Sequence, residues 1–162
     1  MSLITDTLRT STITEELSDA EVEIISEMFE VLDFKAGEAI IRPGYDQPDN
    51  LYILAHGEIQ VKIQSSNDGE SEIHVLKPGD LAGIITFAGG TSAHISATLS
   101  AVGNTKLLSM PRAKFETLIN THPNIVYKVM RGVVREVHGI VRRMNAQSAE
   151  LSNYIYRIHG RY

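Results

Sequence analysis

The chain has 162 residues, of which 43% are hydrophobic and 22% are charged, which indicates one folded domain with an extension. It contains no cysteine, which excludes disulfides, thiolate zinc sites and cysteine-ligated iron–sulfur clusters and suits a reducing compartment. The sequence shows no signal peptide and no apolar run long enough to cross a membrane, so we expect a cytoplasmic protein without membrane contact.

The net charge of −5 is divided unevenly along the chain. Residues 1–111 carry 6 basic and 17 acidic side chains, whereas residues 112–162 carry 9 basic and 3 acidic ones. A basic helix of this kind either binds nucleic acid or packs on the acidic part of its own fold. The second interpretation is favoured, because a lone helix lacks the geometry for reading bases. We therefore expect no sequence-specific DNA binding.

Polar, threonine-rich residues 1–16 are expected to form a mobile N-terminal arm. The capping-box sequence Ser18–Glu21 then begins a helix that we expect to continue to about Glu30. The apolar residues of this helix are Val22, Ile25, Met28 and Phe29. They recur at helical spacing, so one face of the helix is predicted to pack on the segments that follow.

From Phe34 onward apolar and polar residues alternate, as is typical of strands. Turn sequences rich in glycine, proline and asparagine separate the predicted strands. These strands are Ala39–Arg42, Leu51–Ala55, Glu58–Gln64, Glu72–Leu76, Leu81–Ile85, Ala93–Ala101 and Lys106–Met110. About eight strands at this spacing predict an antiparallel jelly-roll-type β-barrel, within a mainly β, α+β domain over residues 17–122. A short helix over Arg112–Asn120, with Phe115, Leu118 and Ile119 inward, completes this domain.

The most regular pattern begins at Pro123 and continues to about Ile158. Apolar residues alternate there at spacings of four and three, which predicts a long coiled-coil helix over residues 123–158, followed by a tail over 159–162. The predicted seam consists of Val126, Met130, Val133, Val137, Ile140, Met144, Gln147, Leu151, Tyr154 and Ile158. Such a helix is about 54 Å long, and packing on its own domain would explain only the first three turns. We expect a parallel homodimer, with Gln147 as the candidate register-setting residue.

Gly132, Gly139 and Ala146 lie seven residues apart on one stripe beside this seam. A glycine inside a helix costs about 1 kcal/mol relative to alanine. Two glycines in register therefore indicate that the barrel wall or the mouth of a pocket approaches the helix backbone. The alternative is that both glycines are merely tolerated.

Four stretches resemble the cyclic-nucleotide-binding domain, in particular the effector domain of the bacterial CRP/FNR regulators. They are Leu17–Glu21, Phe34–Gly44, Leu51–Val61 and Leu76–Asp80. The resemblance covers about residues 17–147 and also includes a long dimerising helix after the β-domain. It implies a non-catalytic regulatory module in signal transduction.

The resemblance places the ligand site at the family's phosphate-binding cassette, which opens Phe-Gly-Glu-Leu and closes Arg-(Ala/Ser)-Ala-(Thr/Ser)-Val. Here the opening is Ala82–Ile85 and the closing is Ile95–Leu99. The glutamate that holds the ribose falls on Ile84, and the arginine that pairs with the phosphate falls on Ile95. The candidate pocket residues are Gly83, Ile84, Ile85, Ile95, Ser96, Ala97 and Thr98. We therefore expect no cofactor and no binding of cyclic AMP or cyclic GMP.

His94 stands beside the arginine position, but strand alternation turns it to the other face unless the register slips by one residue. Two alternative functions stay open. One is a working sensor of a cyclic nucleotide or another small ligand that signals to a separate partner. The other is a cupin-like metal enzyme that uses His74 and His94, for which the sequence supplies no paired glutamate. No catalytic motif is present, so we expect no enzyme.

The CRP/FNR regulators carry a helix-turn-helix domain after the long helix, and Leu151–Tyr162 is too short for one. The resemblance therefore implies an effector module without its DNA-reading part. The module acts alone, signals through a partner protein, or belongs to a longer chain.

Overall fold

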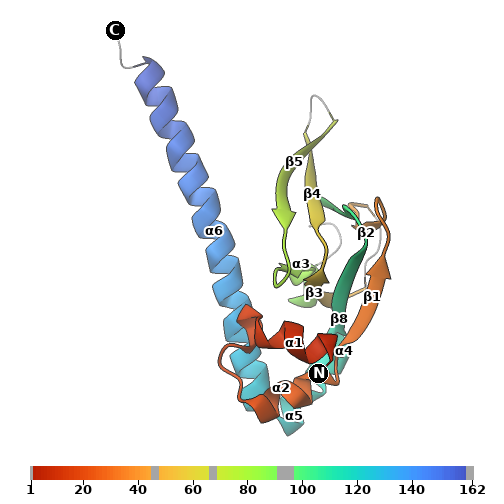
Figure 1. Ribbon diagram of the computed structural model, residues 1–162. Coiled ribbons are helices and arrows are strands. Elements are labelled where there is room, and N and C mark those ends of the chain that lie inside the picture. The colour runs from red at the N-terminus through yellow and green to blue at the C-terminus, as the bar shows by residue number, and fades with distance from the viewer. Residues whose placement is uncertain (1, 45–47, 66–68, 91–96, 160–162) are drawn as a thin grey trace.

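The computed structural model describes residues 2–44, 48–65, 69–90 and 97–159, except for the side chains of residues 64–73, 148 and 150–159. In chain order its elements are α1 (Leu3–Arg9), the 3₁₀ helix η1 (Thr12–Thr14), α2 (Asp19–Ser26), β1 (Glu30–Phe34), β2 (Ala39–Ile41), β3 (Asn50–His56), β4 (Ile59–Ser65), β5 (Gly69–Leu76), β6 (Leu81–Ala82), α3 (Ile84–Phe87), β7 (Ala97–Ala101), β8 (Thr105–Pro111), α4 (Arg112–Glu116), α5 (Leu118–Thr121) and α6 (Pro123–His159) (Figure 1). The prediction of a mainly antiparallel β-domain followed by a long helix is confirmed.

The described strands form two four-stranded antiparallel sheets, with the orders β1-β8-β3-β6 and β2-β7-β4-β5. The predicted jelly-roll-type β-barrel is therefore corrected to a β-roll of two sheets, which the described strands do not join into one barrel. Side chains alternate between the two faces of β3, as the pleat requires. Leu51 and Ile53 pack with the helices, whereas Tyr52 and Leu54 pack between the sheets.

The helix predicted to reach Glu30 ends at Ser26, and β1 follows it. Ser18 caps this helix in a capping box, as predicted, and Val22, Ile25 and Phe29 are buried. Local periodicity could not reveal β1, because this strand is held by its pairing with β8, 70 or more residues later in the chain.

The N-terminal residues form α1 and η1 and pack into the core, which corrects the prediction of a mobile arm over residues 1–16. Leu8 and Ile13 are fully buried. The threonines that suggested a flexible segment make local hydrogen bonds instead; the Thr14 hydroxyl, for example, donates to the Leu8 carbonyl. Threonine and serine side chains that bond to nearby backbone favour such short capped turns.

Two further boundaries differ from the prediction. The predicted helix over Arg112–Asn120 is divided into α4 and α5. Phe115 and Leu118 are buried as predicted. Ile119 is 49% exposed, so the prediction that it points inward was wrong. The predicted strand Leu81–Ile85 ends at Ala82, and α3 begins at Ile84.

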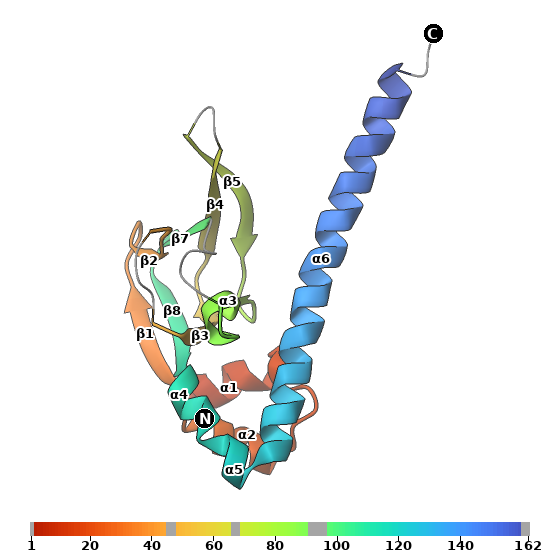
Figure 2. The same cartoon turned by 180° about the vertical axis from the view of Figure 1, so that it is seen from behind.

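Helix α6 begins at Pro123, the first helical position that proline favours, and leaves the β-domain in both views of the molecule (Figures 1 and 2). Its first turns pack on η1 and α5, where Ile125, Val129 and Val133 are buried.

The predicted seam is therefore divided. Val126 and Met130 are half-buried and pack against the core of the domain, as Val133 does. Val137 and Met144 are 39% and 62% exposed, Ile140 is half-buried and Gln147 is exposed. The side chains of Leu151, Tyr154 and Ile158 lie outside the described residues.

A close approach to the backbone of α6 occurs at Gly132. A Cβ added there would lie 2.5 Å from the Ile13 Cα and 2.8 Å from the Thr12 carbonyl oxygen. A Cβ added at Gly139 would meet no described atom within 4 Å. The prediction of a close approach is thus correct for Gly132 alone, and the neighbour is η1 rather than the barrel wall.

Ion pairs flank this contact. Glu16 lies 2.9 Å from the Nε of Arg131 and 3.0 Å from an amino nitrogen of Arg135, and Glu21 lies 3.0 Å from Lys128. The basic face of the long helix therefore packs partly on the acidic N-terminal segment, as the charge distribution suggested. Hydrogen bonds from Arg135 and Arg131 hold the pKa of Glu16 below its ordinary value.

Gly132→Ala is expected to destabilise the fold by about 1–3 kcal/mol, because the added methyl forces η1 away from α6. Gly139→Ala is the matched control; it has room for the methyl and should stabilise the fold by up to about 1 kcal/mol through helix propensity. Urea unfolding of both variants measures the difference. Equal effects of the two substitutions would contradict the close packing at Gly132.

Glu16→Gln is expected to lower the thermal unfolding midpoint at pH 7, where the ion pairs with Arg131 and Arg135 are formed. Because the folded pKa of Glu16 lies below its ordinary value of 4.5, this stabilisation is complete above that pH and is lost as the pH falls through the folded pKa. The midpoints of wild type and variant should therefore converge at low pH. Glu23→Gln, an exposed carboxylate on α2 outside these ion pairs, is the control and should show no such convergence.

Candidate ligand pocket

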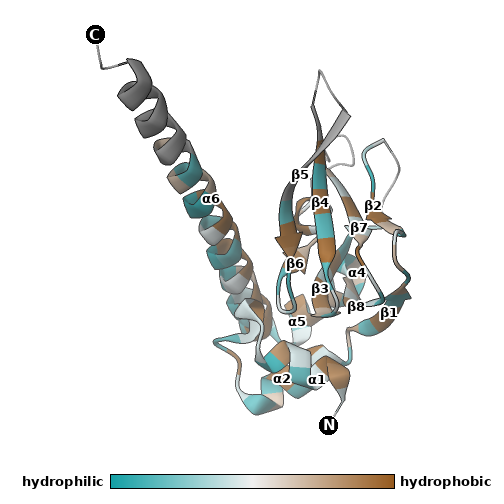
Figure 3. Cartoon of the chain, turned by 45° about the horizontal axis from the view of Figure 1, so that its top comes forward, coloured by the Kyte–Doolittle hydropathy of each residue, from teal (hydrophilic) through white to brown (hydrophobic). Residues whose placement is uncertain are grey.

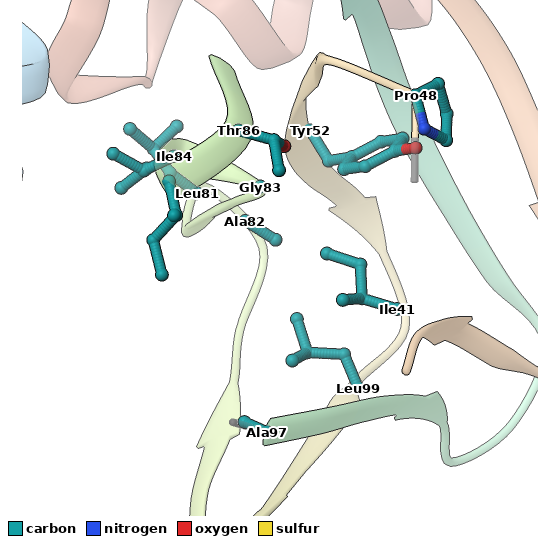
Figure 4. A pocket seen from close by; sticks show the side chains of 11 residues that line it. Ile41, Pro48, Tyr52, Leu81, Ala82, Gly83, Ile84, Thr86, Ala97 and Leu99 are labelled. Atoms are coloured by element: carbon teal, nitrogen blue, oxygen red, sulfur yellow. The ribbon is translucent and has the colours of Figure 1, made fainter. Parts of the chain in front are cut away.

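A cavity of about 220 Å³ lies between the two sheets, beside α3 (Figure 4). Its lining residues come from β2, β3, β6, α3, β7 and the segment before β3. They are Ile41, Pro48, Tyr52, Leu81, Ala82, Gly83, Ile84, Ile85, Thr86, Ala97 and Leu99. None of these described lining residues carries a charge, and most of them are aliphatic.

Gly83 shapes the entrance to α3. Its φ of 79° lies in the left-handed region that glycine adopts without penalty. An added Cβ at this position would collide with the Asn50 carbonyl oxygen. This turn is why the chain leaves the sheet after Ala82 and directs Ile84 and Ile85 along a helical turn instead of a strand.

The end of α3 is fixed to α4. Arg112 donates a hydrogen bond of 3.0 Å to the Thr86 carbonyl oxygen and forms ion pairs of 2.8 Å with Asp49 and 3.3 Å with Glu116. The rings of Phe87 and Phe115 lie 5.3 Å apart between centroids. These contacts couple the pocket wall to the helices that precede α6.

Two lining residues bring polar atoms to the cavity. Tyr52 is 6% exposed, and burial raises the pKa of its hydroxyl, which a hydrogen bond with Asn50 partly offsets. The phenol is therefore neutral at pH 7. Thr86 is 4% exposed, and its backbone oxygen accepts from Arg112.

Some of the candidate site residues predicted from the sequence line this cavity. Gly83, Ile84, Ile85 and Ala97 line the cavity. Thr98 does not, because adjacent residues of a strand point to opposite faces and Ala97 and Leu99 take the pocket side. The predicted positions Ile95 and Ser96, and the alternative His94, lie outside the described residues.

Sequence reasoning missed the pocket residues from other segments, namely Ile41, Pro48, Tyr52, Leu81, Ala82, Thr86 and Leu99. Alternation along the strands contained a signal for Tyr52 and Leu99. Pro48 could not be found in this way, because only the packing of the two sheets brings its segment to the cavity.

A second hollow separates α3 and α4 from α6. Its lining residues are Phe87, Ala88, Gly89, Arg112, Phe115, Glu116, Ile119, Val126 and Met130. Phe87 and Arg112 thus make the contacts that hold the pocket wall, and they also line the hollow beside the long helix.

Within the described part of the chain, no three His, Asp or Glu side chains lie close enough to hold a metal ion. Among the described residues, no helix combines the length and apolar character needed to span a bilayer.

The family model of the cyclic nucleotide-binding domain matches residues 31–122 of this chain. The chain belongs to the cyclic nucleotide-binding domain family. Family membership confirms the resemblance drawn from the turn and strand sequences. The domain resembles regulatory domains of this family.

Curated relatives include the cAMP-dependent protein kinase regulatory subunit of Dictyostelium discoideum, which is 31% identical over 97 residues that cover 58% of this chain and 29% of that protein. Lysophospholipase nte1 of Aspergillus fumigatus is 26% identical over 125 residues that cover 76% of this chain. The chain spans only 8% of the length of this lysophospholipase.

Solved structures share the fold. A cyclic nucleotide-binding domain from Methylobacillus flagellatus matches with a TM-score of 0.78 and 19% identity, covering 90% of this chain and 80% of that one. The catabolite activator protein of Thermus thermophilus matches with a TM-score of 0.68 and 23% identity, covering 85% of this chain and 63% of that one.

Proposed function

We propose that this chain is a regulatory module without catalytic activity and that its pocket does not accept a cyclic nucleotide. Ile84 supports this proposal most directly, because it lines the cavity at the position where the family places the glutamate that holds the ribose. In the sequence, Ile95 stands where the family places the arginine that pairs with the cyclic phosphate. A cytoplasmic location stays a prediction.

The energetic argument concerns the charged phosphate. Hydrogen bonds to charged groups contribute about 1.5–3 kcal/mol each, and a buried charge without a partner costs more. Loss of the glutamate and the arginine together removes roughly 3–6 kcal/mol, which is about 10²–10⁴ in affinity.

A working cyclic-nucleotide sensor is the second candidate function. The kinase regulatory subunit of Dictyostelium discoideum, a relative with 31% identity, is named for its dependence on cAMP. This candidate needs a different cationic partner for the phosphate, and the described pocket lining offers none.

For the output of the module, we propose a homodimer through α6, with a protein partner as receiver of the signal. Val133 of the predicted seam is already buried in its own domain. The exposed apolar surface of α6 is therefore displaced around the helix axis relative to the predicted seam. It consists of Tyr127, Val134, Val137, Val141 and Met144, which are 39–64% exposed. Val134, Val137, Val141 and Met144 follow spacings of three and four, and Tyr127 lies seven residues before Val134. Apolar segments recur along α6 in Figure 3.

Calorimetric titration with cyclic AMP and cyclic GMP is expected to show no saturable binding at micromolar concentration. The combined substitution Ile84→Glu and Ile95→Arg restores both polar groups and should increase the affinity for cyclic AMP. The matched control Ile85→Glu with Ile95→Arg adds the same charges but misplaces the carboxylate by one residue. Micromolar binding by the unmodified chain would support the second candidate instead.

Val137→Glu with Met144→Glu should convert the dimer to a monomer, because like charges would face each other across the two helices. Ala146→Glu with Ala149→Glu adds the same charge at exposed positions of α6 outside this apolar surface and should leave the dimer intact. Light scattering distinguishes a mass near 17.9 kDa from twice that value. A monomeric unmodified protein at micromolar concentration would refute the dimer.

A further inference from the structure

We propose that the cavity between the sheets binds a compact, uncharged and largely apolar molecule that forms a hydrogen bond with the Thr86 hydroxyl. This inference rests on the proposed function, since it assigns a ligand class to a pocket from which cyclic nucleotides are excluded.

The size and the lining of the cavity define the first requirement. An enclosed apolar cavity of about 150 Å³ binds a single aromatic ring, and this pocket, which is open on one side, measures about 220 Å³. Its walls are mainly aliphatic side chains, including Ile41, Ile84 and Leu99. A ligand of one ring or two fused rings would satisfy these walls through apolar contact.

Thr86 defines the second requirement. The residue is 4% exposed, and its hydroxyl takes part in none of the hydrogen bonds among the described residues, whereas its backbone oxygen accepts from Arg112. Figure 4 shows this hydroxyl on the side of the pocket that faces Tyr52. A ligand with one polar atom would form its hydrogen bond with this hydroxyl.

The absence of charge from the described lining defines the third requirement. Transfer of an anion from water into apolar surroundings is far more costly than transfer of a neutral molecule with one hydrogen-bonding group. The described lining therefore favours a neutral ligand over a carboxylate or a phosphate.

Ile85 marks the open side of the cavity, since it lines the pocket and is 47% exposed. A bound molecule would contact α3, whose end is held by Arg112 and by the Phe87–Phe115 ring pair. Both of these groups also line the hollow beside α6. Occupancy of the pocket is thereby connected to the helix that carries the proposed dimer surface.

Indole and indole-3-carboxylate form a probe pair with one ring system and different charge. Calorimetry on the full chain at pH 7 is expected to give a dissociation constant for indole below about 1 mM, at least 30-fold tighter than that for the carboxylate. Absence of indole binding, or equal binding of the two probes, would overturn the proposal.

Four variants test the location. Thr86→Val should weaken indole binding about 3- to 10-fold, while Thr86→Ser, which keeps the hydroxyl, should retain it. Ala97→Leu fills the cavity and should weaken binding at least 10-fold, whereas Val102→Leu enlarges an exposed side chain outside it and should have no effect. Unchanged binding by folded Ala97→Leu would overturn the proposal.

Nuclear Overhauser contacts from indole to the methyl groups of Ile41 and Ile84 provide a measurement on the unmodified chain, which does not depend on how the variants fold. Their absence in a saturated sample would also overturn the proposal. Micromolar displacement of indole by cyclic AMP would refute the proposed function instead. If neither compound binds, the neutral-ligand proposal fails and the exclusion of cyclic nucleotides stands.

Discussion

The packing of η1 against the backbone of α6 determines how the rest of this molecule is arranged. Gly132 permits the contact, because any larger residue would collide with Ile13. The ion pairs of Glu16 and Glu21 with basic residues of α6 flank it on the surface. This contact fixes one face of the long helix to its own domain. It thereby decides which apolar residues of α6 are free to meet another molecule.

The pocket and the long helix are connected through a short series of contacts. Gly83 turns the chain from β6 into α3, and the end of α3 is held by Arg112 and by the packing of Phe87 on Phe115. Helix α5 then leads directly into α6. A change in the position of α3 would therefore be transmitted through packed side chains and an ion-pair network rather than through a flexible linker.

Local signals in the sequence predicted much of the fold. The capping box at Ser18, the glycine-containing turns between the strands and the start of α6 at Pro123 all depend on nearby residues. Two of these turns contain Gly37 and Gly79, whose φ values are 84° and 97°. Helices α1 and η1 were not predicted, because buried threonines have the same composition as an exposed polar arm. The division into two sheets depends on pairing between distant strands, which no local pattern contains.

The candidate site was predicted in the same uneven way. The cassette positions Gly83, Ile84 and Ala97 lie at the cavity as the resemblance implied. Tyr52 and Thr86, its buried polar groups, come from packing that the cassette sequence alone does not specify. The loss of the charged residue at position 84 is visible in the sequence, but the apolar cavity that accompanies it is visible only in three dimensions.

The most direct measurement of the central claim is the nuclear magnetic resonance spectrum of the chain with labelled isoleucine methyl groups, recorded during addition of cyclic AMP. Ile41, Ile84 and Ile85 surround the cavity, so any nucleotide in the pocket must change their environment. We predict that their resonances do not move with cyclic AMP up to about 100 µM, since the lost polar contacts weaken binding to the near-millimolar range. Saturable shifts of these methyl resonances at micromolar cyclic AMP would contradict the account.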